Sequence, residues 1–327
     1  MRKRVFSGAR PTGRQHLGNY LGAIQNYVSL QNEYSCLYCI VDIHALTSME
    51  GSKDVGRLQD NIREMALDWL AAGLNPEKSI IFVQSHVPEV MQLHTLLSMV
   101  TPLNWLLRVP TFKDKVKLQP QNVNYGLVGY PVLQTSDIAL YKADVVPVGE
   151  DQLPHLELAR EIVRRFNYLY GDTFPEPQAK VNRASYILGL DGVQKMSKQI
   201  GNDLEIAASP EETVRRLMTA FTDPARQRRS DPGHPEVCNI YNLHHHFTPG
   251  RLEEIASECR TAGIGCVDCK RLLAEGVNNH LGQLRERRQA LASDSEYVEE
   301  VLHSGARRAR AVARKTLGEV KEKLNLL

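Results

Sequence analysis

The residues best suited to handle phosphate lie near the start of the chain, between Ser7 and Asn19. His16 and Asn19 are three residues apart, so both side chains can donate hydrogen bonds to the same phosphates. Gly18 and Asn19 open a predicted helix, whose free N–H groups and dipole favour an anion. The segment is neither the G-x-G-x-x-G dinucleotide fingerprint nor a G-x-x-x-x-G-K-[ST] loop, which argues against the common dehydrogenases and GTPases.

A second candidate segment lies far downstream, at Gln194–Gln199. Lys195 and Lys198 suit a polyphosphate leaving group, because two positive charges would stabilise the charge that develops on it. Lysines at this spacing are common on protein surfaces, so the segment gains its value from its pairing with the first one. Together the two segments predict an enzyme that uses ATP.

Four of the six cysteines could form a metal centre. Cys238, Cys259, Cys266 and Cys269 have the spacing C-x20-C-x6-C-x2-C. In a cytoplasmic chain such a set is more typical of metal binding than of disulfides. Zinc and an iron–sulfur cluster both accept four thiolates.

The other metal-ligand residue types have simpler interpretations. Cys36 and Cys39 lie inside an apolar run, so we expect buried side chains on opposite faces of a strand. The three adjacent histidines at 244–246 cannot all face one metal, and we expect them to be surface or core residues.

The bulk composition indicates a folded cytoplasmic protein. The chain has 327 residues, of which 42% are hydrophobic, and a net charge of +2, which gives no global basic field of the kind that small DNA-binding domains carry. No apolar run approaches the roughly 20 residues that cross a bilayer, and the start lacks the core of a signal peptide. Positive charge gathers at 226–229 and at 307–315, which predicts phosphate contacts or solvated helix faces.

The elements that must position these residues alternate between strands and helices in the first half of the chain. The sequence predicts buried strands at Val5–Ser7, Cys36–Ile43, Ile80–Val83 and Asp144–Val148. Helical patterns lie between them at 18–31 and 58–69, and a further one follows at 156–166. This alternation predicts an α/β fold with a doubly wound, Rossmann-type parallel sheet. In such a sheet the ligand lies where strands end and helices begin.

The pattern changes near Lys180, beyond which only helices are predicted. Ser209, Pro210 and Glu212 form a helix start, with a Ser cap and a Pro in the first turn. We expect a catalytic domain at 1–185, a smaller helical domain at 186–297, and a last helix at 298–327 that packs back on the first domain.

The motifs resemble a known family. HLGN at 16–19 followed by KMSK at 195–198 resembles the HIGH and KMSKS signatures of class I aminoacyl-tRNA synthetases. The segments at 129–152 and 40–47, GYPVLQTSDIALYKADVVPVGEDQ and IVDIHALT, are similar to tryptophanyl-tRNA synthetases. Two positions depart from the pattern: Gln199 replaces the last Ser of KMSKS, and Arg10 stands where many relatives carry Gln.

The resemblance implies a reaction without a protein nucleophile. The carboxylate of tryptophan attacks the α-phosphate of Mg-ATP, and the acyl group then passes to the terminal ribose of tRNA(Trp). Positioning and charge stabilisation would supply the catalysis. The implied catalytic residues are His16, Asn19, Lys115, Lys195 and Lys198. The implied ATP-binding residues are Arg10, Pro11, Thr12, Gly18, Asn19, Gly149, Glu150, Asp151, Ile187, Lys195, Met196, Ser197, Lys198 and Gln199.

The implied amino-acid pocket needs an apolar slot and one buried acceptor for the indole N–H. The match within SDIALY makes Asp137 that acceptor. The other implied residues are Phe6, His44, Tyr130, Gln134, Val146, Val148 and Gln152, although strand packing explains Val146 and Val148 equally well. Two alternatives stay open: a tyrosyl-tRNA synthetase, which would share fold and signatures, and a synthetase-like chain that only binds.

The resemblance also bears on the cysteines and on partners. The segment TAGIGCVDCKRLL resembles the part of certain bacterial tryptophanyl-tRNA synthetases that carries a [4Fe–4S] cluster, although the family's first spacing is slightly longer. It favours a structural cluster over zinc and makes Arg226–Arg229 a candidate tRNA contact. It also implies a homodimer, for which the apolar run Val90–Trp105 could supply the interface, although a buried helix would explain the same run. We expect no membrane or DNA partner.

Overall fold

The computed structural model describes residues 2–49, 55–118, 120–181 and 186–326. Its centre is a five-stranded sheet with the order β3-β2-β1-β4-β5, and every pairing is parallel. The strands are β1 (Arg4–Ala9), β2 (Ser35–Ile40), β3 (Ser79–Val83), β4 (Val145–Val148) and β5 (Gln178–Val181). The order reverses between β1 and β4, so the predicted doubly wound fold is confirmed.

One predicted strand was too long, and one strand was not predicted. The β2 strand ends at Ile40, because Asp42 already begins the short helix α3 (Asp42–Ala45). The edge strand β5 was not predicted at all. Its four residues are half-buried or exposed and pair with β4 on one side, so they lack the continuous apolar pattern of a central strand.

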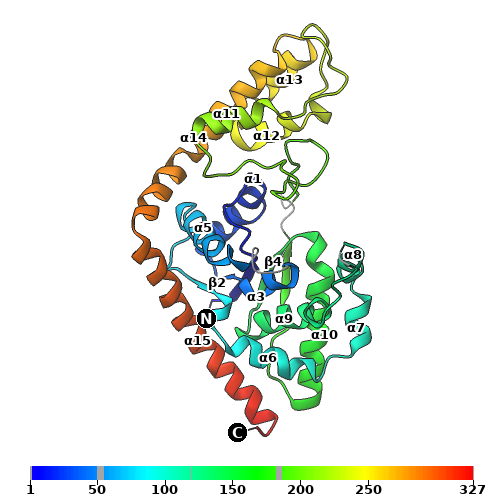
Figure 1. Ribbon diagram of the computed structural model, residues 1–327, viewed down its shortest axis with the longest axis vertical. Helices are drawn as coiled ribbons and strands as arrows, with labels where there is room; N and C mark the ends of the chain where they lie inside the picture. The colour runs from blue at the N-terminus through cyan, green and yellow to red at the C-terminus, as the bar shows by residue number, and fades with distance from the viewer. Residues whose placement is uncertain (1, 50–54, 119, 182–185, 327) are drawn as a thin grey trace.

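Helices cover both faces of the sheet (Figure 1). One core cluster packs α2 (Gln25–Leu30) and α5 (Leu58–Ala71) on one face. The other packs α6 (Glu89–Ser98), α9 (Tyr125–Leu140) and α10 (Leu153–Tyr170) on the opposite face. Cys36 belongs to the first cluster and Cys39 to the second, so the prediction of buried thiols on opposite faces is confirmed.

The connection after β1 is a helix with a local irregularity. It runs through α1 (Leu17–Asn19), a π-helical turn η1 (Tyr20–Ile24) and α2. Turns of this type are rare and occur often at functional sites. Gly22 of this turn lines the cavity described below.

Beyond β5 the described chain is mostly helical. It contains α11 (Pro210–Met218), α12 (Asn239–Phe247), α13 (Leu252–Arg260) and α14 (Cys266–Ser293). The helices α11, α12, α13 and the start of α14 form the upper part of Figure 1. The Ser209 side chain accepts a hydrogen bond from the Glu212 N–H at 3.1 Å, which confirms the predicted helix start. A third core cluster joins this part to Leu17 and Leu21 of the first helix.

The last helix, α15 (Ser295–Lys323), lies along the edge strand β3. A Cβ added to Gly305 would lie 1.8 Å from the carbonyl oxygen of Ile81, so only glycine permits this approach. Arg308 donates to the carbonyl oxygens of Pro76 and Ser79.

Short elements complete the described chain. They are α7 (Leu103–Arg108), α8 (Pro110–Leu118), η2 (Leu46–Ser48), η3 (Gln84–His86), η4 (Glu150–Gln152), η6 (Pro235–Val237) and η7 (Pro249–Arg251). In the ranges that the structure describes, no helix combines the length and the apolar character needed to span a bilayer.

Candidate active site

A cavity of about 500 Å³ opens where β1 and β4 end and their following helices begin. Many of the predicted site residues line it: Phe6, Arg10, His16, Gly18, Asn19, His44, Tyr130, Gln134, Asp137, Val146, Val148, Gly149, Asp151, Gln152, Ile187, Lys195 and Met196. Residues from both predicted segments therefore meet at one cavity.

Other predicted residues do not line this cavity. They are Pro11, Thr12, Glu150, Ser197, Lys198 and Gln199. The backbone of Lys115 belongs to α8, and its side chain lies outside the described part of the structure. The roles predicted for these residues stay predictions.

His16 and Asn19 cap each other at the start of α1. The Asn19 N–H donates to His16 Nδ1, and the His16 N–H donates to Asn19 Oδ1, both at 3.2 Å. This pairing fixes the His16 proton on Nε2 and leaves Asn19 Nδ2 as a donor. Burial, reinforced by Lys195 and Lys198, lowers the pKa of His16 to about 4, so the ring is a neutral hydrogen-bond donor near pH 7.

The downstream chain clamps this segment through its backbone. The Leu17 N–H donates to Leu204 O at 2.8 Å, and the Ile206 N–H donates to Gln15 O at 2.9 Å. In addition, the Gly18 N–H donates to the sulfur of buried Met196 at 3.3 Å. These contacts explain how two motifs so far apart in the chain reach one site.

The lysine segment is one arm of a hairpin, in which Leu188 pairs with Lys195. Lys195 lies 5.8 Å from the centre of the Tyr186 ring, a cation–π contact. Lys198 forms an ion pair with Glu205 at 3.1 Å. Each positive charge therefore has a local partner within the downstream part of the chain.

Asn202 organises this hairpin, a role that was not predicted from the sequence. The buried Asn202 side chain accepts from the Ser197 N–H at 2.7 Å and donates to Asp191 at 2.8 Å. Asparagine is common in turns for this reason, but nothing in the sequence indicated which turn it would hold.

A buried ion network lies beneath the first segment. Asp68 of α5 accepts from the Gln15 N–H and from Arg288 of α14, the latter at 2.6 Å. Arg14 and Arg288 both bind Glu64. Burial raises the pKa of Asp68, and the Arg288 guanidinium opposes that shift. The network joins the helical part of the chain to the first predicted segment.

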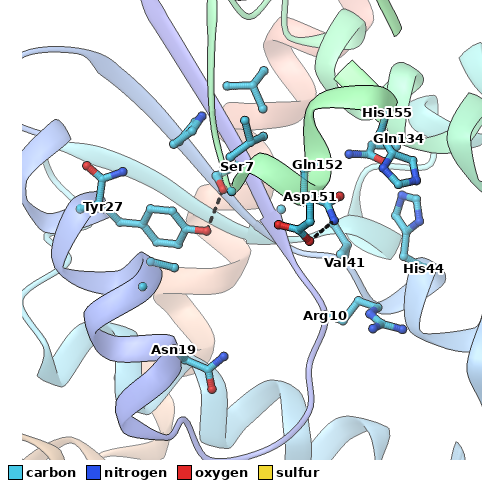
Figure 2. Close-up of a pocket in the computed structure, with 18 of the residues that line it drawn as sticks. Ser7, Arg10, Asn19, Tyr27, Val41, His44, Gln134, Asp151, Gln152 and His155 are labelled. Carbon is cyan, nitrogen blue, oxygen red and sulfur yellow. Dashed lines mark hydrogen bonds between the residues drawn. The ribbon is translucent and has the colours of Figure 1, made fainter. Parts of the chain in front are cut away.

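The opposite end of the cavity is lined from α9, α3 and α10. Tyr130, Gln134 and Asp137 share one face of α9. His44 Nε2 lies 2.9 Å from Asp137 Oδ2, and the Tyr130 hydroxyl lies 2.8 Å from His155 Nε2. Figure 2 shows His44, Gln134 and His155 gathered on one side, with Asn19 and Tyr27 on the other.

Ser7 and Gly8, from the first predicted segment, also line the cavity. Several other lining residues were missed from the sequence: Gly22, Ala23, Asn26, Tyr27, Val41, Thr47, Ile138, Pro147 and His155. Ser7 donates to the Tyr27 hydroxyl at 2.8 Å, and Gln152 donates to Asp151 at 2.8 Å (Figure 2). His155 lies three residues after the predicted Gln152, near the start of α10, and this spacing is the signal that could have found it.

The four candidate metal-ligand cysteines lie close enough to influence one another. Burial and the three other thiols raise the pKa of Cys269 to about 12, and burial also raises the pKa of Cys259. His244 was expected to be a surface or core residue, and it is fully buried with Nε2 at 3.3 Å from Cys269 Sγ. In the ranges described, no group of three or more His, Cys, Asp or Glu side chains is arranged to hold a metal ion.

Several arginines of the two basic clusters make contacts within the protein. Arg226 donates to the Ile264 and Arg229 carbonyl oxygens, and its Nη1 lies 3.9 Å from Cys259 Sγ. Arg229 donates to two further carbonyl oxygens of the loop before α14. In the C-terminal cluster, Arg310 and Arg314 bind Glu89. Much of the predicted phosphate-binding charge is therefore engaged internally.

The fold and the cavity can be compared with known proteins. A family model described as tRNA synthetases class I (W and Y) matches residues 1–282. The tryptophan--tRNA ligase of Deinococcus radiodurans is 47% identical over 328 residues, and that of Thermotoga maritima is 45% identical over 329; each match covers 99% of both chains. A crystal structure of tryptophanyl-tRNA synthetase from Campylobacter jejuni, complexed with ADP and tryptophan, superposes with a TM-score of 0.89 at 35% identity, covering 99% of this chain and 100% of that one.

A parallel sheet with a helix start and a lysine hairpin at one cavity defines the class I tRNA synthetases. The chain belongs to this family, and its full-length relatives place it among the tryptophan--tRNA ligases.

Proposed function

We infer that this chain activates L-tryptophan with ATP and transfers it to tRNA(Trp). The contact between the HLGN and KMSK segments at one end of a cavity, with Asp137 buried at the other, carries this inference. A tryptophan carboxylate oxygen attacks the α-phosphorus, the bond to the β-phosphate oxygen breaks, and pyrophosphate leaves. A ribose hydroxyl of the terminal tRNA nucleotide then displaces AMP from the adenylate.

At the ATP end, the chain's own donors would hold the phosphates. His16 Nε2–H and the Asn19 amide face the cavity from the start of the first helix. Lys195 and Lys198 would leave Tyr186 and Glu205 to meet the departing pyrophosphate, because a highly charged leaving group is a stronger partner than one exposed carboxylate. Gly149, Asp151 and Ile187 would contact the nucleoside.

Mg2+ would enter with ATP. The carboxylates among the described lining residues are Asp137 and Asp151. Asp137 already accepts from His44, so the cavity offers no dedicated set of carboxylates for a divalent ion among the described residues. Mg2+ commonly binds through substrate phosphates, where it offsets their negative charge.

At the amino-acid end, Asp137 would accept the indole N–H. The aspartate is 2% exposed, so a substrate that lacks this donor leaves one acceptor site of the buried carboxylate unfilled beside the contacts from Gln84 and His44, which costs about 1–3 kcal/mol. Phe6, Val146 and Ile138 supply an apolar wall. Tyr130, Gln134 and Gln152 are then available for the ammonium and carboxylate groups.

Pyrophosphate exchange with each of the twenty amino acids tests this function. We expect exchange with tryptophan and none with tyrosine. Exchange with tyrosine alone would instead identify a tyrosyl-tRNA synthetase, and exchange with no amino acid would leave a chain that only binds.

We propose that the four cysteines hold a [4Fe–4S] cluster with a structural role. The chemistry of the donor set supports a shared site, because four cysteine thiolates are the usual ligands of such a cluster. The resemblance of the segment around Cys266 and Cys269 to cluster-bearing relatives favours the cluster over zinc, which would need its four thiolates about 2.3 Å from one centre. The cluster would join α13 and α14 within a helical tRNA-binding domain at 186–297.

Metal and sulfide analysis of anaerobically purified protein tests the cluster. We expect iron and acid-labile sulfide in equal amounts, and their loss in Cys269→Ser. The matched control is Cys36→Ala, because Cys36 is also a buried thiol but belongs to the sheet. Stoichiometric zinc in a colourless protein would contradict the proposal.

A homodimer is also proposed. Exposed apolar side chains gather on α6, α7 and the start of α9, which pack together. Met99, Leu103 and Tyr125 are 77%, 60% and 69% exposed. Large exposed apolar side chains on elements that pack together support a protein interface, and a second copy of this chain is the partner that we propose for it.

A further inference from the structure

We propose that Gln84 is a positioning residue that sets the preference for an indole N–H by fixing the Asp137 carboxylate. Gln84 begins η3, immediately after β3, far in sequence from the α9 residue that it binds. The inference rests on the proposed function, because it assumes that Asp137 accepts the indole N–H.

The orientation of the Gln84 amide follows from its partners. Its Oε1 accepts from the backbone N–H of His44 at 3.3 Å, and a backbone N–H can only donate. The Nε2 group must therefore face Asp137, where it lies 2.9 Å from Oδ1 and 2.8 Å from Oδ2. One amide thus links α3 to the carboxylate and contacts both of its oxygens.

His44 completes the arrangement. Its Nε2 lies 2.9 Å from Asp137 Oδ2, so this oxygen has two neighbours while Oδ1 has one. A carboxylate oxygen can accept more than one hydrogen bond. Oδ1 therefore keeps the larger capacity to accept from a ligand, and the two donors resist rotation of the carboxylate.

Gln84 acts from behind the cavity. It is 1% exposed and is not among the lining residues, whereas Asp137 and His44 are. A substitution at Gln84 should therefore change the acceptor without removing a contact to the substrate. That separation distinguishes a positioning residue from a binding residue.

Gln84 donates to the Asp137 carboxylate in surroundings that are mostly neutral or negative, so its hydrogen bonds help to stabilise the charged form. The titratable groups near this carboxylate are His44 on α3, His94 on α6, Cys39 on β2 and Tyr141 after α9. Burial raises the pKa of both Cys39 and Tyr141 and lowers the pKa of His94, so these groups are neutral near pH 7. Asp42, on α3, accepts from the Ser85 N–H at 2.9 Å and adds negative charge nearby.

The first test compares tryptophan with an isostere whose indole nitrogen is replaced by sulfur, β-(benzothien-3-yl)alanine. Gln84→Met keeps the approximate shape and removes the donor. We expect the ratio of kcat/KM for tryptophan to that for the isostere, measured by pyrophosphate exchange, to fall about tenfold. The KM for ATP should not change.

Gln84→Glu supplies a second, pH-dependent test that does not depend on the Met variant folding. When the introduced carboxyl group is protonated it can donate to Asp137, whereas its ionised form repels that aspartate. We therefore expect the rate of tryptophan exchange by this variant, relative to the unaltered chain, to rise as the pH falls from about 8 to about 6. This range suits the assay because raised pKa values are typical of paired carboxyl groups. A constant relative rate would count against the positioning role.

The matched control is Gln31→Met. Gln31 is another buried glutamine, and its amide donates to Gly73 O at 2.9 Å, away from the cavity. This variant should lose stability without changing the discrimination ratio. An equal fall in the ratio for both variants would show a general packing effect and overturn the inference.

Failures of the separate claims are distinguishable. If the unaltered chain shows no tryptophan exchange, the proposed function fails. If Asp137→Ala keeps the full discrimination ratio, the role of Asp137 fails. If both of these behave as expected while Gln84→Met keeps the ratio of the unaltered chain, the inference about Gln84 is wrong.

Discussion

At the scale of single residues, the proposed phosphate site consists of groups that are neutral or loosely paired in this structure. His16 is a neutral donor because it is buried beside two lysines, and those lysines rest against Tyr186 and Glu205. Donors that are already in place need little reorganisation when charge develops on the phosphates.

The neutral state of His16 predicts a pH dependence of stability. Its folded pKa of about 4 lies below the unfolded value of 6.5, so the unfolded chain binds more protons between these values. The contribution of this residue to stability is complete above pH 6.5 and is lost as the pH falls towards 4. His16→Asn keeps a good N-cap without titrating in this range.

Urea unfolding at about pH 7.5 and about pH 5 measures this effect. We expect His16→Asn to lose about 1–2 kcal/mol less than the unaltered chain on acidification. An equal loss in both proteins would mean that folding does not lower the pKa of His16.

The lysine hairpin gives a kinetic prediction. Lys195→Ala should lower kcat for tryptophan-dependent exchange about 10²–10³-fold, because it removes a charge that stabilises the leaving pyrophosphate. Tryptophan binding, measured by equilibrium dialysis, should not change. Lys315→Ala, which removes an exposed lysine on α15, is the control. A loss of tryptophan affinity in Lys195→Ala would contradict the assigned role.

At the scale of elements, the long helices hold the site in register through a few close contacts. Arg288 of α14 is the cation that compensates Asp68, whose side chain is fully buried under the first segment. Arg288→Ala should lower the free energy of unfolding by about 3–5 kcal/mol, because it leaves a buried carboxylate unpaired. Denaturant unfolding measures this, with Arg215→Ala as the control from an exposed ion pair with Glu212. Similar small losses in both variants would contradict the buried network.

Two glycines of α15 provide a matched pair. A Cβ at Gly305 would overlap Ile81 O, whereas a Cβ at Gly318 meets nothing within 4 Å. Gly305→Ala should therefore destabilise the protein by about 1–3 kcal/mol or more, and Gly318→Ala should stabilise it by about 0.5–1 kcal/mol. Thermal unfolding of the two variants should shift in opposite directions. Shifts of the same sign would show that α15 does not pack on β3 as described.

The sequence predicted the elements better than the contacts between them. Apolar periodicity located four of the five strands, and local cap chemistry located the start of α11 at Ser209. The pairing of 204–206 with 15–17, by contrast, is made by backbone groups. Such contacts have no side-chain pattern, which is why the bridge and the edge strand β5 escaped prediction.

The candidate site divides in the same way. Residues inside motifs, such as His16 and Asp137, could be named from the resemblance and do line the cavity. Supporting residues such as Asn202, Arg288 and Gln84 lie outside the motifs and act through contacts that only the fold creates. The arginine clusters were predicted to contact phosphate from their charge alone. The sequence could not show that several of these arginines already bind carbonyl oxygens or Glu89 within the protein.

At the scale of the whole molecule, the proposed dimer is open to a direct test. Met99→Glu combined with Leu103→Glu places two charges in the exposed apolar surface of α6 and α7. Sedimentation velocity should show a dimer for the unaltered chain and a monomer for the double variant. Val214→Glu, on α11 at the other end of the molecule, is the control and should stay dimeric. A monomeric unaltered chain would contradict the proposal.

The whole molecule also has to bring an activated amino acid to a tRNA end, and one measurement tests that most directly. A transcript of tRNA(Trp) is incubated with the protein, ATP and a mixture of radiolabelled tryptophan and tyrosine, and the amino acid released by mild alkali is identified. The account predicts tryptophan esterified to the terminal ribose, with formation dependent on ATP. Release of tyrosine, or of no amino acid, would contradict it.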